Sequence, residues 1–247
     1  MFWWLMKYVI LGPILRLVYR PKVKGLENVP AEGGAILAPN HVSFLDDFML
    51  PLMIRRRKVV MLAKADYFAK WYTRWFFRAA GCIPVRREGG SASAAALSGG
   101  IDALREGKLV GIFAEGTRSP DGRLYRGKTG VARMALEARV PVIPVALVGT
   151  FEVWPYNRKI PKPGKVEIRF GKPLFFERHY ETPGDRFVLR SVTDEVMYEI
   201  MLLSGQEYVD EYGVKVKKQL EAAARGEAPS SDRAARVDSE SAAESKS

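Results

Sequence analysis

The stretch GAILAPNHVSFLDD at residues 34–47 decides the fold, because its character changes part-way along. Its first five residues, GAILA, form an apolar run that predicts a buried β-strand. A helix-like segment begins just after it, at Phe48. A histidine placed where a strand gives way to a helix lies at the edge of a sheet, where α/β folds bind ligands. His41, one of only two histidines in the chain, therefore predicts a functional site at this edge.

Asp46 follows His41 by five residues and can reach back to it. In one continuous helix the two side chains would point roughly 140° apart, but a tight loop lets the carboxylate fold onto the imidazole. A neutral imidazole accepts a proton near pH 7, and a carboxylate on its other nitrogen fixes the tautomer and stabilises the imidazolium. The structural alternative is that Ser43 and Asp46 form a helix capping box. The spacing alone leaves both interpretations open.

The rest of the chain alternates between predicted strands and helices. This alternation predicts an α/β fold with a mainly parallel sheet flanked by helices, in one domain over residues 22–221. From residue 222 the composition turns to Ala, Ser, Glu and Arg without an apolar period, so residues 222–247 are predicted to be a disordered tail. The expected strands are residues 59–63, 81–87, 109–113, 142–148 and 166–170, and the expected helices are residues 91–107, 126–138 and 187–203.

Residues 1–21 form a separate apolar segment, interrupted by Lys7 and Arg16. Gly12 and Pro13 predict a kink in any helix here. The uninterrupted apolar run is too short to span a bilayer, and neither a basic start nor a small-residue cleavage site indicates a signal peptide. Its tryptophans and tyrosine suit a membrane interface. We expect a membrane-associating helix embedded in one leaflet; the alternative is an ordinary helix that covers the core.

The net charge of +11 and the pI of about 9.7 predict an anionic partner. Nucleic acid, an acidic membrane and a phosphorylated substrate all fit that charge. No recognised nucleic-acid-binding module is present, which argues against nucleic acid. The single cysteine, Cys82, excludes an intrachain disulfide and a cysteine metal cluster, and two histidines are too few for a histidine-rich metal site. We therefore expect neither a metal nor a cofactor.

A second motif, Phe113-Ala-Glu-Gly-Thr-Arg118, again directly follows an apolar run that predicts a strand. Together with His41-x-x-x-x-Asp46 it resembles the glycerolipid acyltransferase family, the 1-acylglycerol-3-phosphate acyltransferases. Two more segments resemble the remaining blocks of that family: residues 81–87, which end in Arg87, and residues 142–148. The four blocks occur in the family's order and spacing, and the resemblance covers residues 22–150.

This resemblance implies an activity and a mechanism. An acyl thioester is already activated, whereas the acceptor hydroxyl must lose its proton as it attacks. His41 can take that proton and Asp46 can stabilise the resulting cation, which requires no serine or cysteine nucleophile. The family's reaction moves a fatty acyl group from acyl-CoA or acyl carrier protein to 1-acylglycerol-3-phosphate, which is also called lysophosphatidic acid. The product is phosphatidic acid, used in phospholipid biosynthesis.

The resemblance also places acceptor binding in the Glu-Gly-Thr-Arg block. Guanidinium groups bind phosphate in bidentate geometry, so Arg118 and Arg87 are expected to hold the acceptor phosphate. Gly116 lets the backbone approach a ligand closely. Glu115 is expected to bind a glycerol hydroxyl or to hold Arg118, and Thr117 to donate one hydrogen bond. The substrate-binding candidates are Lys64, Arg87, Glu115, Gly116, Thr117 and Arg118.

Several functional alternatives stay open. Within the same class, the acceptor is glycerol-3-phosphate, another lysophospholipid, an ornithine lipid or a glycolipid. Outside it, the basic charge also fits a non-catalytic membrane scaffold or a nucleic-acid-binding protein. We expect the protein at the cell membrane, peripheral or monotopic on the cytoplasmic face, with lysophosphatidic acid, an acyl thioester and the membrane surface as its partners.

Overall fold

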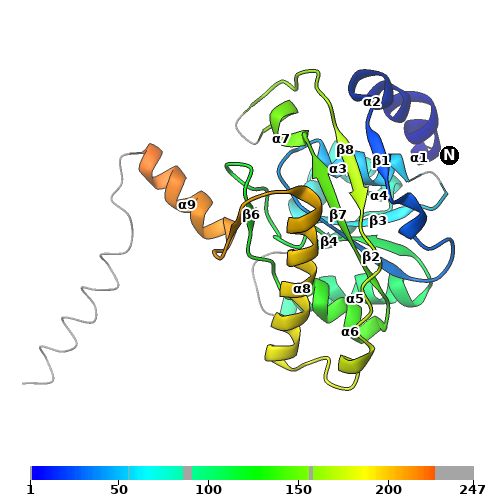
Figure 1. The fold of residues 1–247 in the computed structure, drawn as a ribbon. Helices are drawn as coiled ribbons and strands as arrows, with labels where there is room; N and C mark the ends of the chain where they lie inside the picture. The colour runs from blue at the N-terminus through cyan, green and yellow to red at the C-terminus, as the bar shows by residue number, and fades with distance from the viewer. Residues whose placement is uncertain (1, 55, 86–90, 156–157, 226–247) are drawn as a thin grey trace, which may run out of the picture.

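A mostly parallel sheet forms the centre of the molecule (Figure 1). The computed structural model describes residues 2–54, 56–85, 91–155 and 158–225. In this part of the chain the sheet has seven strands, and all neighbours are parallel except the antiparallel pair β7–β8. The predicted α/β fold is therefore confirmed. In spatial order the strands are β1 (Lys22–Lys24), β8 (Glu167–Phe170), β7 (Val142–Val148), β2 (Ala35–Pro39), β5 (Leu109–Gly111), β3 (Val59–Lys64) and β4 (Ile83–Val85).

Helices cover both faces of the sheet. Strand β2 shows the division, because successive side chains of a strand point to opposite faces. Ala35 and Leu37 pack with α2 (Leu11–Tyr19) and α3 (Asp46–Met53), whereas Ile36 and Ala38 pack against the other layer. A strand buried on both faces reads as one continuous apolar run, which is how this stretch appears in the sequence. The second layer consists of α5 (Ser91–Arg105), α6 (Gly130–Ala138) and α8 (Arg186–Ser204).

Shorter elements connect these layers. Helix α9 projects away from the body of the molecule (Figure 1) and continues to Ala224, past the predicted start of the tail; residues 226–247 lie outside the described residues. The remaining elements are α1 (Phe2–Leu5), the π-helical turn η1 (Met6–Ile10), η2 (Leu26–Asn28), η3 (Ala65–Phe68), α4 (Trp71–Ala80), β6 (Leu124–Tyr125), α7 (Thr150–Val153), η4 (Glu177–His179), β9 (Tyr208–Val209) and α9 (Gly213–Ala224). β6 and β9 pair as a small parallel sheet.

The amino-terminal helical segment, residues 2–19, turns its two cations inward. A π-helical turn stands where the sequence predicts a kink, just before Pro13. Lys7 is 3% exposed, and its Nζ donates to the carbonyl oxygen of Ile54. Arg16 Nη2 donates to the carbonyl oxygen of Leu52 at 3.1 Å. Carbonyls at the end of a helix have no partner within it, so both cations satisfy the end of α3. Burial, together with the nearby Arg16 charge, lowers the pKa of Lys7 to about 8.

The opposite side of this segment is apolar and exposed. Leu17 is 73% exposed and Ile14 is 52% exposed, whereas Leu15 and Tyr19 pack into the core. The segment therefore covers the core, as one interpretation of the sequence expects, and still presents an apolar outer face. No helix in the described ranges is both long and apolar enough to cross a bilayer. The large exposed apolar residues of the segment are Trp4, Leu5, Tyr8, Val9, Ile10, Ile14, Leu17 and Val18.

One edge of the sheet brings distant segments together. Strands β2 and β7 end there, and β8 begins there because Val148 pairs with Glu167. Strand β1 also begins there, because Lys22 pairs with Glu167. We call this the carboxyl edge. It comprises the loop after β2 (residues 40–45), the connection between β7 and β8 (residues 149–166) and the end of α2.

Candidate active site

The loop at the carboxyl edge brings His41 and Asp46 together. Asp46 is the first residue of α3 and is fully buried. His41 Nδ1 lies 3.1 Å from Asp46 Oδ2. The same oxygen accepts the backbone N–H groups of Val42 at 2.8 Å and Ser43 at 2.7 Å. One carboxylate thus shapes the loop and contacts the imidazole. The Ser43–Asp46 capping box does not form in full, because Leu45 is the N-cap of α3 and has no side-chain cap.

This contact determines which nitrogen of His41 can take a proton. When Nδ1–H donates to the carboxylate, Nε2 is the acceptor. The ring also stacks on Phe113, with centroids 3.7 Å apart and planes inclined by 17°. His41 is only 5% exposed, so its contact with Asp46 is shielded from solvent. The contacts with Asp46 and Phe113 hold the ring in one orientation.

Glu115 of the Glu-Gly-Thr-Arg block and Ser119, directly after the block, hold the backbone of His41 from both sides. Glu115 Oε1 accepts the N–H of His41 at 2.9 Å, and the N–H of Ser119 donates to the carbonyl oxygen of His41 at 2.7 Å. Glu115 Oε2 accepts the N–H of Tyr125 at 3.0 Å. Both carboxyl oxygens of Glu115 therefore contact main-chain N–H groups, and its expected contact with a glycerol hydroxyl or with Arg118 stays a prediction. Glu115 positions the loop that carries His41.

The environment of Glu115 disfavours its charge. The side chain is 1% exposed, and this burial raises its pKa to about 8, although the two N–H groups lower it and the carboxylates Asp46 and Asp121 raise it further. A carboxyl oxygen accepts a hydrogen bond in either protonation state, whereas the nitrogen of an amide cannot. Two backbone donors therefore explain why a carboxyl group stands here.

The next three residues of the block face different surroundings. Gly116 has φ +70°, and a Cβ at this position would lie 2.9 Å from the side chain of Lys128. Thr117 is 9% exposed, and a Cβ on Gly213 at the start of α9 would lie 3.2 Å from its methyl group. The guanidinium carbon of Arg118 lies 5.2 Å from the centroid of the Phe44 ring. This cation–π contact holds Arg118 beside the His41 loop.

The other two basic candidates are Lys64 and Arg87, and only the backbone of Lys64 lies in the described part of the chain. Lys64 is the last residue of β3, two strands from β2 in the sheet, so its backbone lies on the same carboxyl edge. Its side chain lies outside what the structure describes. Arg87 belongs to residues 86–90, which also lie outside the described residues.

Ser43, together with Asn40 and Trp154, which the sequence did not single out, completes the surroundings of His41. Asn40 Oδ1 accepts the N–H of Leu147 at 2.7 Å, and its Nδ2 donates to the carbonyl oxygen of Leu147, which ties the loop to β7. Ser43 Oγ donates to the carbonyl oxygen of Trp154 at 2.7 Å. The Trp154 ring meets Phe44 edge-on at 5.1 Å. Position was the only available signal for Asn40 and Ser43, which follow the end of β2, whereas Trp154 follows α7 and carried no such signal.

An apolar pocket opens beside this loop, between α3, β3 and α4. It encloses about 460 Å³ of space, part of it open to solvent. Burial raises the pKa of the Cys82 thiol to about 12, so this side chain stays a neutral thiol and lines the wall. The residues that line the pocket include Phe44, Phe48, Met61, Tyr67, Phe77 and Cys82.

Comparison with known proteins places the chain in a family. Residues 20–148, more than half of the chain, match the family model described as Acyltransferase. The chain belongs to the acyltransferase family. The match covers all four blocks, so the family predicted from the two motifs is confirmed.

Relatives within the acyltransferase family carry one activity in their names. The chloroplastic 1-acyl-sn-glycerol-3-phosphate acyltransferase BAT2 of Brassica napus is 31% identical over 159 residues, 64% of this chain and 46% of that protein. The 1-acyl-sn-glycerol-3-phosphate acyltransferase of Bacillus subtilis is 32% identical over 162 residues, 65% of this chain and 77% of that protein. The chain therefore spans less than half the length of the plant relative and most of the bacterial one.

A solved acyltransferase structure shares the fold. The crystal structure of the 1-acyl-sn-glycerophosphate acyltransferase PlsC from Thermotoga maritima superposes with a TM-score of 0.59 at 26% sequence identity. The similarity covers 78% of this chain and 79% of that one. It therefore extends well beyond the region that contains the motifs.

Proposed function

We propose that the protein is an O-acyltransferase that moves a fatty acyl group from an acyl thioester to the free hydroxyl of 1-acylglycerol-3-phosphate, giving phosphatidic acid for phospholipid biosynthesis. The observation that carries this proposal is the buried pair His41 Nδ1–Asp46 Oδ2, 3.1 Å apart, at the carboxyl edge of the sheet. The names of the relatives from Brassica napus and Bacillus subtilis support the same reaction.

The chemistry follows from the free nitrogen of the imidazole. As the acceptor hydroxyl approaches the thioester carbonyl, its proton passes to His41 Nε2, and Asp46 stabilises the imidazolium that forms. The new C–O bond forms, the C–S bond breaks, and the proton returns from His41 to the departing thiolate. General-base assistance of this kind contributes about 10²–10⁴-fold. The steps need no covalent enzyme intermediate and no cofactor; acyl-CoA or acyl carrier protein supplies the thioester.

Arg118 is the main candidate for the acceptor phosphate. Its guanidinium lies over Phe44 beside the His41 loop, and a guanidinium fork matches two phosphate oxygens. Arg87, Lys64 and Thr117 remain candidates for the same task. A different acceptor, such as glycerol-3-phosphate, another lysophospholipid, an ornithine lipid or a glycolipid, would still need the base but not the same anion contact.

The apolar pocket and the amino-terminal segment suit lipid substrates. The pocket shares Phe44 with the Arg118 contact, so an acyl chain in it would start close to the base. The exposed apolar face of residues 2–19 would lie in the outer part of one leaflet, with Lys7 and Arg16 kept inside the protein. We place the protein on the cytoplasmic face of the cell membrane, peripheral or monotopic.

The two histidines of the chain provide a matched test. Purified His41→Ala and His179→Ala variants would be incubated with lysophosphatidic acid and an acyl-CoA, and phosphatidic acid would be measured by mass spectrometry. We expect His41→Ala to lose about 10²-fold or more of kcat. The His179 side chain accepts a hydrogen bond from its exposed neighbour Arg178, far from the His41 loop in the sequence, so that variant should match the wild type. Activity of His41→Ala within tenfold of the wild type would remove His41 as the base.

A further inference from the structure

The connection between α7 and β8 carries a dense basic loop, residues 158–165, with the sequence RKIPKPGK. All four of its cations are exposed, and the loop contains no carboxylate. Ile160 in its middle is 76% exposed. Within the described part of the chain, none of the four cations forms an ion pair. The cations are Arg158, Lys159, Lys162 and Lys165.

Hydrogen bonds hold the loop in a defined position. The N–H of Lys162 donates to the carbonyl oxygen of Val153 at 3.0 Å, and Trp154 Nε1 donates to the carbonyl oxygen of Arg158 at 3.0 Å. Pro161 and Pro163 restrict the backbone further. The four charges are therefore displayed from an ordered scaffold that ends at the residues flanking the active site.

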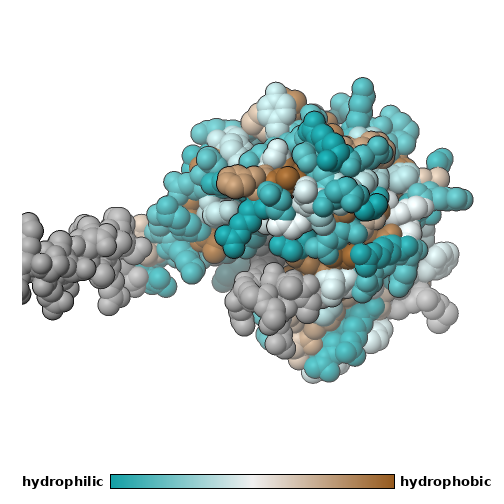
Figure 2. Space-filling view, turned by 90° about the horizontal axis from the view of Figure 1, so that it is seen from below, coloured by the Kyte–Doolittle hydropathy of each residue, from teal (hydrophilic) through white to brown (hydrophobic). Residues whose placement is uncertain are grey.

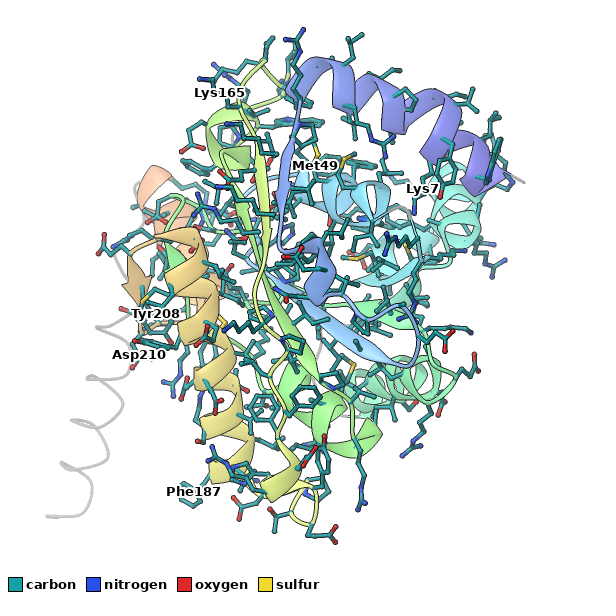
Figure 3. The ribbon with its side chains drawn as sticks, turned by 45° about the vertical axis from the view of Figure 1, so that its right-hand side comes forward. Lys7, Met49, Lys165, Phe187, Tyr208 and Asp210 are labelled. Carbon is teal, nitrogen blue, oxygen red and sulfur yellow. The ribbon has the colours of Figure 1, made fainter. Side chains whose placement is uncertain are left out.

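The loop lies beside the end of α2. The N–H of Lys22 donates to the carbonyl oxygen of Val166 at 3.0 Å, directly after the loop. Figure 3 shows Lys165 next to the end of α2, with Phe187 at the opposite end of the molecule. Exposed Arg20 and Lys22 add two cations at this junction, next to the exposed apolar residue Leu17.

Few acidic groups oppose this charge. Glu167, at the start of β8, is already paired with Lys24 at 2.7 Å and with Arg169 at 3.0 Å, and these partners hold its pKa near 2. Glu152 on α7 is the exposed acid of this connection. The carboxyl edge thus combines a concentrated positive charge with an apolar helix face, a combination that fits an acidic membrane surface rather than nucleic acid.

We propose that residues 158–165 form a second membrane contact that binds acidic lipid headgroups, with Ile160 reaching into the apolar layer. The cations attract the anionic surface, and the loop orients the carboxyl edge so that His41 faces the lipid phase. Because Trp154 contacts Phe44 and accepts from Ser43, the docked loop adjoins the Arg118 contact directly. The inference rests on the proposed function in taking the acceptor from the membrane.

A pair of charge-matched variants tests this contact. In one, Arg158, Lys159, Lys162 and Lys165 are replaced by Gln. In the control, four exposed cations of the opposite edge are replaced by Gln: Lys108, Lys172, Arg178 and Arg186. Both proteins lose the same number of positive charges, so any difference between them reports position. Co-sedimentation would use phosphatidylcholine vesicles with and without phosphatidylglycerol, over a salt series.

We expect the loop variant to lose about tenfold or more of its partitioning onto the phosphatidylglycerol vesicles, and the control to lose much less. The difference should shrink with added salt and be absent on pure phosphatidylcholine. Equal losses in both variants would overturn the proposal, as would a loss of binding to double-stranded DNA with vesicle binding unchanged. Acyl transfer measured in detergent micelles separates the two proposals. The loop variant should keep the activity of the wild type there. No activity in the wild type would contradict the proposed acyltransferase function but not the membrane contact.

Discussion

The His41 loop and the amino-terminal helical segment both reverse the usual distribution of side chains, but in opposite ways. The loop packs against buried polar groups: Asp46, which follows it, is fully buried, and Glu115, which bonds to its backbone, is 1% exposed. The amino-terminal segment exposes apolar groups, with Leu17 73% exposed. The buried polar groups find their partners within the chain, at 2.7–3.1 Å. The exposed apolar groups are those that a lipid surface would bury under the proposed function.

Helix α6 shows the ordinary arrangement for comparison. It has nine residues, as α2 does, but its apolar residues are buried, and Arg133 and Glu137 pair on the outside at 3.6 Å. Figure 2 shows the end of the molecule where the parallel strands begin, and hydrophilic residues cover most of it. The apolar outer face of residues 2–19 therefore differs from the outer face of α6. It follows that the two regions should respond differently when the lipid surface is removed.

The largest effect should come from Asp46→Asn. No partner of Asp46 Oδ1 is found among the described residues, so the amide nitrogen of Asn can occupy that position while its oxygen keeps the contacts of Oδ2. The loop should keep its shape but lose the charge that stabilises the imidazolium. We expect kcat to fall by about 10²-fold or more, equally in vesicles and in detergent micelles. Unchanged turnover would show that the carboxylate only shapes the loop.

Glu115→Gln should have the next largest effect. The amide offers one acceptor to two backbone donors, so the N–H of His41 or of Tyr125 loses its partner. We expect the free energy of unfolding to fall by about 1–3 kcal/mol, with reduced kcat in both assay formats. Chemical denaturation and turnover would measure these two changes. If Glu115→Gln matched the wild type in both measurements, the hydrogen bond from the N–H of His41 to Glu115 would contribute neither to stability nor to turnover.

The same variant tests how the stability of the fold depends on pH. The pKa of Glu115 is raised to about 8 in the fold, against about 4.3 in an unfolded chain. Between these values the folded state holds a proton that the unfolded state has lost. The contribution of Glu115 to stability is therefore present at low pH and is lost as the pH rises through about 8. Glu115→Gln should lack that slope in denaturation curves across this window.

The smallest effect should come from the amino-terminal segment, and only at a surface. Ile14→Gln with Leu17→Gln removes two exposed apolar side chains, so the fold should not change. We expect weaker recovery with vesicles, on the order of tenfold, because burying each such side chain stabilises by about 1.5–3 kcal/mol when complete. Phe187→Gln, which changes an 86% exposed residue at the opposite end, is the control. Equal recovery of both variants in flotation assays would show that the exposed apolar face of residues 2–19 does not contribute to vesicle binding.

Local patterns predicted most of the fold and the central pair of the site. The sheet follows from apolar runs that each strand carries in its own residues. His41 and Asp46 meet because only a short loop separates them. The task of Glu115 could not be predicted, because its partner is the backbone of His41, 74 positions away, and backbone groups leave no mark in a sequence. The inward course of Lys7 was missed for the same reason: its partner is a carbonyl at the end of α3.

Helix α3 joins the two regions compared above. Its first residue is Asp46, and the carbonyls at its other end are held by Lys7 and Arg16. Eight residues make a rod about 12 Å long. The carboxylate of Asp46 and the contacts of the amino-terminal segment thus lie at opposite ends of one short helix. A bilayer that binds residues 2–19 would also restrain α3. Under the proposed function, lipid would then stabilise the position of Asp46 as well as supply the acceptor.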